Sequence, residues 1–277
     1  MLDTTTLGWL TETLGRDGFV LSRGAGSAAA GCIVYFGNFR RLSKKNVGTL
    51  YVVATPIGNL EDITLRALRV LKEVPLVAAE DTRVTRTLFR AHDIHTPLAS
   101  FHEFTSPARR SRLIERLEAG DVALVTDAGT PGVSDPGFPL IRDALSAGHQ
   151  VVPVPGASSA IAALVASGLP THAFCFFGFL PRTSATRRRF FAQHATSDET
   201  LVVFESPHRV VAALKDLVAT LGPDRAIAVG RELTKRFEEI FRGTAAAALA
   251  HFEQQAPRGE FTFVIGGRTA QLPGAAA

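Results

Sequence analysis

The chain has 277 residues, enough for one large domain or two modest ones. Its two cysteines, Cys32 and Cys175, lie far apart and its eight histidines are scattered, so no metal or redox spacing is visible, which fits a reducing cytoplasm. The net charge of +4 excludes little, because residues 1–47 hold six Lys/Arg and three Asp/Glu; subtracting them leaves 24 basic and 23 acidic residues for 48–277.

Residues 1–47 differ in composition from the rest of the chain. They are rich in Gly, Ser and Thr, and Ala25–Val34 is too short an apolar run to span a membrane. No basic start followed by an apolar core and a cleavage site is present, which argues against a secretory signal. We expect a disordered extension, and we hypothesise that translation starts at Val47, just before the organised sequence begins at Gly48.

From Thr49 onward, predicted strands alternate with predicted helices. Strands are expected at Leu50–Ala54, Leu76–Ala79, Val122–Val125 and Val151–Val154. The expected helices are one with Leu65, Leu68 and Leu71 on one face and Asp62 or Thr64 as its cap, one after Arg83, one opened by Ser106-Pro107 and closed by Gly120, one from Phe138 with Leu140, Ile141 and Leu145 on one side, and one over Ser159–Ser167. This alternation predicts an α/β fold with a mainly parallel sheet and helices on both faces.

The segment Gly168-Leu169-Pro170 breaks this pattern, and we place a domain boundary there. The prediction is an N-terminal α/β domain over 48–168, a C-terminal α/β domain with a mixed sheet over 169–267, and a loose Gly/Pro/Ala-rich tail over 268–277. Further strands are expected at Ala173–Phe177, Leu201–Phe204, Ala226–Val229 and Phe261–Ile265, with Glu238–Arg242 as a candidate, and further helices near Arg187–His194, Pro207–Leu221 and Thr244–Gln255.

One stretch of the N-terminal half, residues 122–137, has the pattern of a ligand-binding loop. An apolar strand enters it, three glycines and two prolines follow, and a helix begins at Phe138. This unit holds nucleotide-like ligands at the carboxyl ends of strands in α/β proteins. It is neither a Walker loop nor a G-x-G-x-x-G loop, and an ordinary strand–helix turn is the alternative.

Eight motifs then carry a resemblance to a known family. They are TPIGNLEDIT (55–64), AEDTR (79–83), TDAGTPGVSDPG (126–137), PGASSA (155–160), FFGFLP (176–181), FESPHR (204–209), GRELTK (230–235) and GEFTFVIGG (259–267). In this order they resemble the RsmI family of ribosomal RNA small subunit methyltransferases, in the tetrapyrrole-methylase superfamily. The chain departs from many members by its N-terminal extension and by ending soon after the last predicted strand, without their helical tail.

The resemblance implies a cytoplasmic enzyme, usually a homodimer, with two α/β domains and the cofactor in the cleft between them. It implies 2′-O-methylation of a cytidine in the decoding region of 16S ribosomal RNA, free or in the small ribosomal subunit. S-adenosylmethionine is the implied methyl donor, and neither a metal nor a membrane is expected. The implied cofactor-binding residues are Pro56, Gly58, Ala128, Gly129, Thr130, Pro131, Val133, Ser134, Ala157, Ser158, Ser159, Phe204, Glu205, Ser206, Glu260, Phe261 and Thr262.

Acidic side chains at predicted strand ends are the candidates for catalysis. Glu80, Asp81 and Asp127 follow strands and are expected to face the cleft, where a carboxylate would accept the proton of a hydroxyl group. Arg83 is expected to hold an RNA phosphate or to orient Asp81. An interdomain salt-bridge network is the alternative for these four residues. Asp135, which precedes Pro136, is interpreted as a turn former.

Two arginine clusters are candidates for RNA binding. Arg109, Arg110 and Arg112 open one predicted helix, and Arg187, Arg188 and Arg189 open another, where arginine is unfavourable for the helix dipole. A solvated surface is the alternative. His208, Arg209 and Lys235 lie in strand-end loops and are added to this set.

Two other functions compete with the RNA methyltransferase. A methyltransferase of the same fold could act on a tetrapyrrole or another small molecule, but the motifs TPIGN, EDTR and FESPHR favour RNA. A non-enzymatic RNA-binding protein could retain the fold, but the intact glycine-rich loop argues against it. A nicotinamide dehydrogenase is disfavoured because the dinucleotide fingerprint is missing.

Overall fold

The computed structural model describes residues 47–254 and 257–271 of the chain. The expected disordered extension, apart from Val47, and residues 272–277 of the expected tail lie outside this part. The start-site hypothesis likewise lies outside the described residues.

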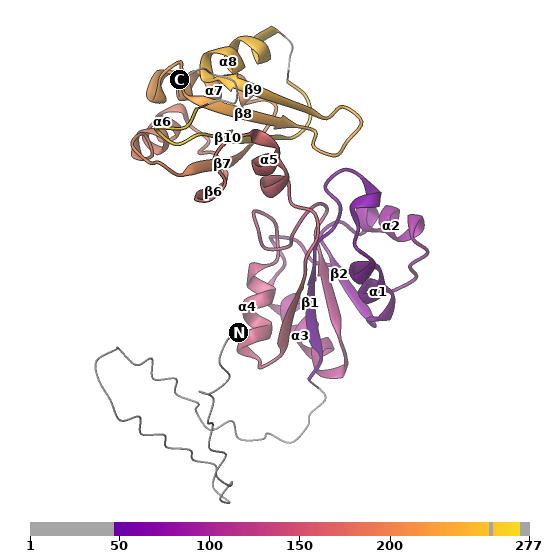
Figure 1. The fold of residues 1–277 in the computed structure, drawn as a ribbon. Coiled ribbons are helices and arrows are strands. Elements are labelled where there is room, and N and C mark those ends of the chain that lie inside the picture. The colour runs from indigo at the N-terminus through magenta and orange to yellow at the C-terminus, as the bar shows by residue number, and fades with distance from the viewer. Residues whose placement is uncertain (1–46, 255–256, 272–277) are drawn as a thin grey trace, which may run out of the picture. The chain divides into compact units, whose positions relative to one another are not determined.

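Five parallel strands form the first sheet (Figure 1). They are β1 (Thr49–Val53), β2 (Leu76–Ala79), β3 (Leu98–Ser100), β4 (Val122–Val125) and β5 (Gln150–Val154), in the order β3-β2-β4-β1-β5. β4 is buried along its whole length, as expected for an apolar run in a sheet covered on both faces. Four of the strands were predicted from the sequence, whereas β3 was missed because it is a three-residue, partly exposed edge strand without an apolar run.

Helices cover both faces of this sheet, which confirms the prediction. The elements are a 3-10 turn η1 (Leu60–Asp62), α1 (Leu65–Glu73), α2 (Thr82–Ala91), α3 (Pro107–Ala119) and α4 (Phe138–Ser146). α1 and α2 share a core cluster on one face, while α3 and α4 share a cluster on the other (Figure 1). Thr64 caps α1 by accepting a hydrogen bond from the Ala67 N–H, and Ser106 caps α3, so the N-terminal signals fix where these helices begin.

The predicted apolar faces of two helices were wrong in part. Leu65 is 86% exposed, because the buried stripe of α1 runs through Ala67, Val70 and Leu71 instead. Leu145 is 58% exposed, because α4 buries the i, i+4 pair Leu140 and Ala144 and the next position turns away from the sheet.

The second sheet is mixed, as predicted. Its elements are α5 (Ser159–Ser167), β6 (Phe174–Phe179), α6 (Ser184–Gln193), β7 (Thr200–Glu205), α7 (Val210–Leu221), β8 (Ala226–Arg231), β9 (Glu239–Thr244), α8 (Ala245–Gln254) and β10 (Phe261–Ile265). The strand order is β6-β7-β10-β8-β9, with β6 and β7 parallel and the other pairs antiparallel. The candidate strand at Glu238–Arg242 is confirmed as β9.

Two core clusters cover the faces of the second sheet. α6, α7 and α8 pack on one face around Phe191, Leu214 and Phe263. α5 packs on the other face, where Leu164 lies among Val202, Ala228 and Val264. Since α5 shares its core with the second sheet and the described residues form one compact unit, the domain limits drawn around Gly168 stay a prediction.

Candidate functional site

The glycine-rich loop lies where the chain leaves two neighbouring strands toward opposite faces of the first sheet. From β1 the chain runs through α1 to β2, and from β4 it runs through α4 to β5. Because α1 and α4 cover opposite faces, a crevice opens at the carboxyl ends of β1 and β4. The strand order therefore places a ligand site at the loops that follow these two strands.

Hydrogen bonds join these two loops. The Thr55 N–H donates to the Gly129 carbonyl at 2.9 Å, and the Gly129 N–H donates to the Thr55 carbonyl at 3.1 Å. The Thr55 hydroxyl donates to the Thr126 carbonyl at 3.0 Å. Gly129 adopts φ +77°, a left-handed conformation that residues with a Cβ rarely take. The loop is thus held in one shape by its own backbone.

A cavity of about 300 Å³ opens beside this loop, within the size range of small-molecule sites. Its wall includes the glycine-rich loop, the start of α5, the ends of β6 and β7, and the segments around Leu233 and Phe261. Apolar side chains alternate with hydroxyl groups and carboxylates along this wall. The lining residues are Ile57, Ala128, Gly129, Thr130, Val133, Ser134, Asp135, Ser158, Ser159, Ala160, Phe179, Phe204, Glu205, Ser206, Pro207, Leu233, Glu260, Phe261 and Thr262.

Glu205, at the end of β7, is the most buried charged group of this wall. Its side chain is fully buried, and its Oε1 accepts hydrogen bonds from the Ser206 N–H at 2.7 Å and from Arg209 Nη2 at 2.6 Å. Burial raises the pKa of the Glu205 carboxyl above its usual range, although the bonds from Ser206 and Arg209 act in the opposite direction. Its Oε2 has no hydrogen-bond partner among the described residues, so one buried acceptor at the cavity is left for a ligand.

Most residues predicted to bind a cofactor line this one cavity. The exceptions are Pro56, Gly58, Pro131 and Ala157, which are close in sequence to lining residues but are not in the wall. Sequence reasoning missed six lining residues: Ile57, Asp135, Ala160, Phe179, Pro207 and Leu233. All six belong to the motifs quoted above, so the motifs themselves were the available signal.

The four predicted catalytic residues lie together but outside the cavity wall. The Asp81 N–H donates to Asp127 Oδ1 at 3.0 Å, and the Asp127 N–H donates to Glu80 Oε2 at 3.3 Å. The Arg83 guanidinium, 85% exposed, pairs with Asp81 at 2.6 Å and lowers the pKa of that carboxyl to about 2. Burial raises the pKa values of Glu80 and Asp127. These residues form a carboxylate cluster rather than a wall of the site.

The second arginine cluster is only partly available for RNA. Arg187 is 3% exposed, and its Nη2 pairs with Asp216 at 2.5 Å. This burial removes Arg187 from the predicted RNA-binding set, because a buried, paired guanidinium cannot reach a phosphate. Arg188 also contacts Asp216, at 2.6 Å, but stays exposed, and Arg189 is exposed.

The first cluster, on α3, divides in the same way. Arg109 and Arg112 are exposed, whereas Arg110 Nε pairs with Asp143 at 2.7 Å and its Nη1 donates to the Thr105 carbonyl at 3.2 Å. Arg109 and Arg112 have no ion-pair partner within the described part of the chain. These two side chains are therefore free to contact a phosphate.

The basic residues of the strand-end loops have mixed surroundings. His208 is exposed, Arg209 pairs with Glu205, and Lys235 Nζ contacts Glu232 at 2.9 Å and Glu260 at 3.0 Å. Although burial acts to lower it, the bonds to these two carboxylates raise the pKa of Lys235.

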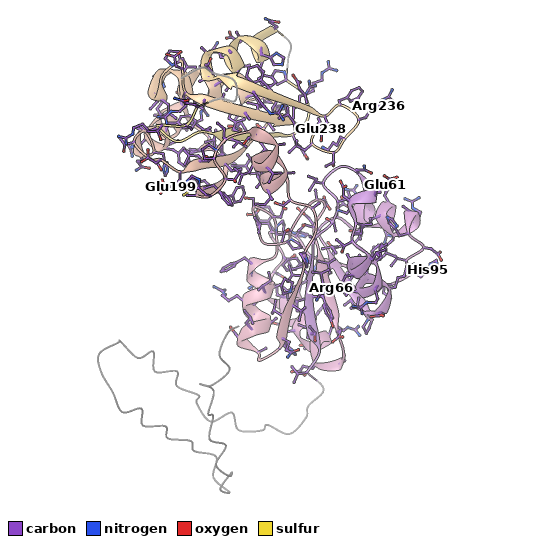
Figure 2. The ribbon with its side chains drawn as sticks, in the orientation of Figure 1. Glu61, Arg66, His95, Glu199, Arg236 and Glu238 are labelled. Carbon is purple, nitrogen blue, oxygen red and sulfur yellow. The ribbon has the colours of Figure 1, made fainter. Side chains whose placement is uncertain are left out.

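The loop between β8 and β9 adds exposed groups that the sequence reasoning did not select. Figure 2 shows Arg236 and Glu238 on this loop. The Arg236 guanidinium lies 5.5 Å from the centre of the exposed Phe237 ring.

Residues 47–254 and 257–271 contain no cluster of three or more His, Cys, Asp or Glu side chains arranged to hold a metal ion. Within the same ranges, every helix is too short or too polar to cross a bilayer.

Comparison with known proteins places this geometry in a family. The model of the family described as Tetrapyrrole (Corrin/Porphyrin) Methylases matches residues 49–249. The chain is 48% identical to ribosomal RNA small subunit methyltransferase I of Pseudomonas aeruginosa, with 80% of each chain covered. It is 44% identical to the protein of the same name from Thermotoga maritima, over 80% of this chain and 100% of that one. A uroporphyrin-III C-methyltransferase of Thermus thermophilus, solved with S-adenosylhomocysteine, has the same fold, with a TM-score of 0.54, 24% identity, and 78% and 97% of the two chains covered.

Proposed function

The chain belongs to the ribosomal RNA small subunit methyltransferase I family of the tetrapyrrole methylases, and from this membership we propose its substrate and its site residues. It is a methyltransferase that uses S-adenosylmethionine. We propose that the acceptor is the ribose 2′-hydroxyl of a cytidine in the decoding region of 16S ribosomal RNA. The observation that carries this proposal is the cavity, whose wall gathers residues from seven of the eight motifs.

The cavity wall fits the cofactor by its polar groups. S-adenosylmethionine supplies a methyl group on a positively charged sulfur when it is bound. We propose that the backbone of Gly129 and Thr130 and the hydroxyls of Ser158, Ser159 and Thr262 hold its polar parts. The unpartnered Oε2 of Glu205 is suited to accept a hydrogen bond from a ligand hydroxyl or amine.

The proposed site includes the other predicted cofactor residues. Ala128, Val133, Ser134, Phe204, Ser206, Glu260 and Phe261 lie in the wall, and Pro56, Gly58, Pro131 and Ala157 shape it from neighbouring positions. Together they would fix the orientation of the reacting groups. Alignment is a large part of the catalysis expected here, because the leaving group is already a good one.

We propose two roles for the predicted catalytic residues. Glu80 and Asp127 would act through their charge, since neither lies in the cavity wall. Arg83, mostly exposed, would contact an RNA phosphate while held by Asp81.

The proposed RNA surface follows from which basic groups are exposed. Arg109, Arg112 and Arg189 are exposed and carry no ion-pair partner in the described residues, so we propose them as phosphate contacts. His208 and Arg188 join them as exposed groups. Arg110, Arg209 and Lys235 already contact carboxylates, so their proposed part is to hold the surface in place.

Labelled S-adenosylmethionine tests the proposal directly. The acceptors are small ribosomal subunits and free 16S RNA from cells that lack this enzyme, and the products are analysed as nucleosides. Label in a 2′-O-methylated cytidine supports the proposed reaction, and the better acceptor identifies the assembly stage. Cofactor binding without labelled RNA would contradict the RNA proposal and favour a small-molecule acceptor.

We also propose a homodimer in the cytoplasm, on the family resemblance alone. Light scattering during size-exclusion chromatography of the full chain tests the first part. A mass near that of one 29.6 kDa chain would contradict it.

A further inference from the structure

A second cavity, of about 370 Å³, adjoins the proposed cofactor cavity. Its wall contains the segment after β3, from Phe101 to Thr105, and the residues that lead into α4. Only Ser134 and Asp135 occur in both walls among the residues the structure describes. A group bound in one cavity and a group bound in the other would therefore meet at these two residues.

We propose, building on the proposed function, that the second cavity receives the acceptor nucleoside and that the Asp135 carboxylate takes the proton of its hydroxyl group. In this step the hydroxyl O–H bond breaks as the new O–CH₃ bond forms. The methyl–sulfur bond breaks with its electron pair left on sulfur, and the proton ends on Asp135. Cation, hydroxyl and carboxylate thus become a neutral thioether, an ether and a carboxylic acid.

The surroundings of Asp135 suit a proton acceptor. Its carboxylate has no hydrogen bond or ion pair within the described part of the chain, so its lone pairs are free. Solvent reaches it because it faces both cavities, while protein surrounds it beyond that. This partial burial, with the negative charges of Glu80, Asp127 and Glu260, raises the pKa of Asp135 to about 7. Such a group is ionised near neutral pH and basic enough to accept a proton.

Other charged groups face the second cavity. His102, Glu103 and Arg110 lie in its wall, and Arg110 is paired with Asp143. From the first cavity, Glu205 is paired with Arg209, and Glu260 contacts Lys235. Asp135 is thus the acidic group common to both cavities and without a cationic partner in the described residues.

Phe138 gives the second cavity an aromatic wall suited to a base. Its ring is 64% exposed, although it stands at the first turn of α4, where an apolar side chain would otherwise be expected to pack. An aromatic face in such a wall can stack on a nucleobase turned out of its helix. The geometry therefore points to a nucleoside rather than a flat tetrapyrrole as occupant.

The test compares Asp135→Asn with Asp224→Asn, an exposed aspartate that lines neither cavity. Single-turnover methyl transfer to 16S RNA should fall at least about 100-fold in the first variant and stay unchanged in the second. Calorimetric affinities for S-adenosylmethionine and S-adenosylhomocysteine should stay within about threefold of the unaltered chain. Loss of S-adenosylmethionine affinity alone would overturn the proposal, because it would show that Asp135 only balances the sulfonium charge.

Two further measurements do not depend on the folding of that variant. Single-turnover rates of the unaltered chain should rise about tenfold per pH unit up to about pH 7 and then level off. Carbon NMR of the aspartate-labelled chain should show one carboxyl titrating near pH 7, and this signal should be absent from the Asp135→Glu variant. A pH-independent rate, or no such carboxyl, would overturn the proposal.

Phe138→Ala tests the acceptor cavity separately. The Michaelis constant for RNA should rise at least about fivefold, and cofactor affinity should not change. An unchanged Michaelis constant would contradict the stacking role. If the unaltered chain labels no RNA, the proposed function itself fails, whereas labelled RNA with a fully active Asp135→Asn variant refutes only this inference.

Discussion

The Arg187–Asp216 pair is the clearest single-residue feature outside the site. Asp216 is 3% exposed and accepts hydrogen bonds from Arg187, Arg188 and Ser184 at 2.5, 2.6 and 2.7 Å. Burial acts to raise the pKa of Asp216, but these three bonds outweigh it and leave the pKa lowered. Removing the carboxylate would strand a buried guanidinium, which is far more costly than losing a surface pair.

Asp216→Ala should therefore lower the free energy of unfolding by about 3–5 kcal/mol, measured by urea denaturation. Asp224→Ala, at an exposed position without an ion pair among the described residues, should change it by less than about 0.5 kcal/mol. Because the folded-state pKa of Asp216 is lowered, its stabilisation is present above the unfolded pKa and is lost as the pH falls through the folded one. The difference between the two variants should thus shrink in acid, and a constant difference would contradict this account.

Single residues also mark the limit of the sequence reasoning. An Arg-Arg-Arg run does not reveal which arginine turns toward the sheet, and Arg187 does so because it occupies the inward position of α6 opposite Asp216 on α7. Asp135 was interpreted as a turn former because it precedes a proline. Its place in two cavity walls depends on β3, a strand with no clear sequence signal.

The glycine-rich loop is the element on which the proposed site depends most. Gly137 adopts φ +152° before α4, and a Cβ there would meet the Gly132 nitrogen at 2.8 Å and its Cα at 3.2 Å. The Gly132 N–H donates to the Pro136 carbonyl at 3.2 Å, so this contact closes the loop. An added methyl group must push the two halves of the loop apart.

Gly137→Ala should weaken S-adenosylmethionine binding at least about tenfold, as measured by calorimetry, because the cavity wall moves. Gly148→Ala is the matched control, since Gly148 also has a positive φ of +83° but nothing lies within 4 Å of the added Cβ. The control should lose about 1 kcal/mol of stability and keep its affinity. Equal affinities in the two variants would show that the closed loop is not needed for binding.

Elements were the most predictable level of this molecule. The spacing of apolar residues and caps such as Thr64 and Ser106 act within a few neighbours, so they are legible in one sequence. The cavity wall is different, because it gathers segments that are up to 205 positions apart, from Ile57 to Thr262. Its residues could be chosen only through the motif resemblance, and pairs such as Lys235–Glu260 had no local signal at all.

At the scale of the whole molecule, charge is nearly balanced outside residues 1–47. With 30 basic and 26 acidic residues in total, 24 and 23 of which lie in 48–277, no broad positive field is available to attract RNA. RNA affinity must then depend on a few local contacts. Arg109 and Arg112 on α3 belong to the face of the first sheet opposite α1, which carries the exposed Arg66 (Figure 2).

Arg109→Glu combined with Arg112→Glu should therefore weaken RNA binding at least about tenfold at moderate salt, because two phosphate contacts become repulsions. The slope of log affinity against log salt should fall by about 2, roughly one for each phosphate that is no longer neutralised. Arg66→Glu changes the net charge by the same amount per site but lies on the other face, so a double variant with Arg69→Glu should change affinity much less. Filter binding with 16S RNA over a salt series measures both quantities. Equal reductions in affinity in the two double variants would mean that RNA responds to net charge alone, and the α3 surface would have no specific part in binding.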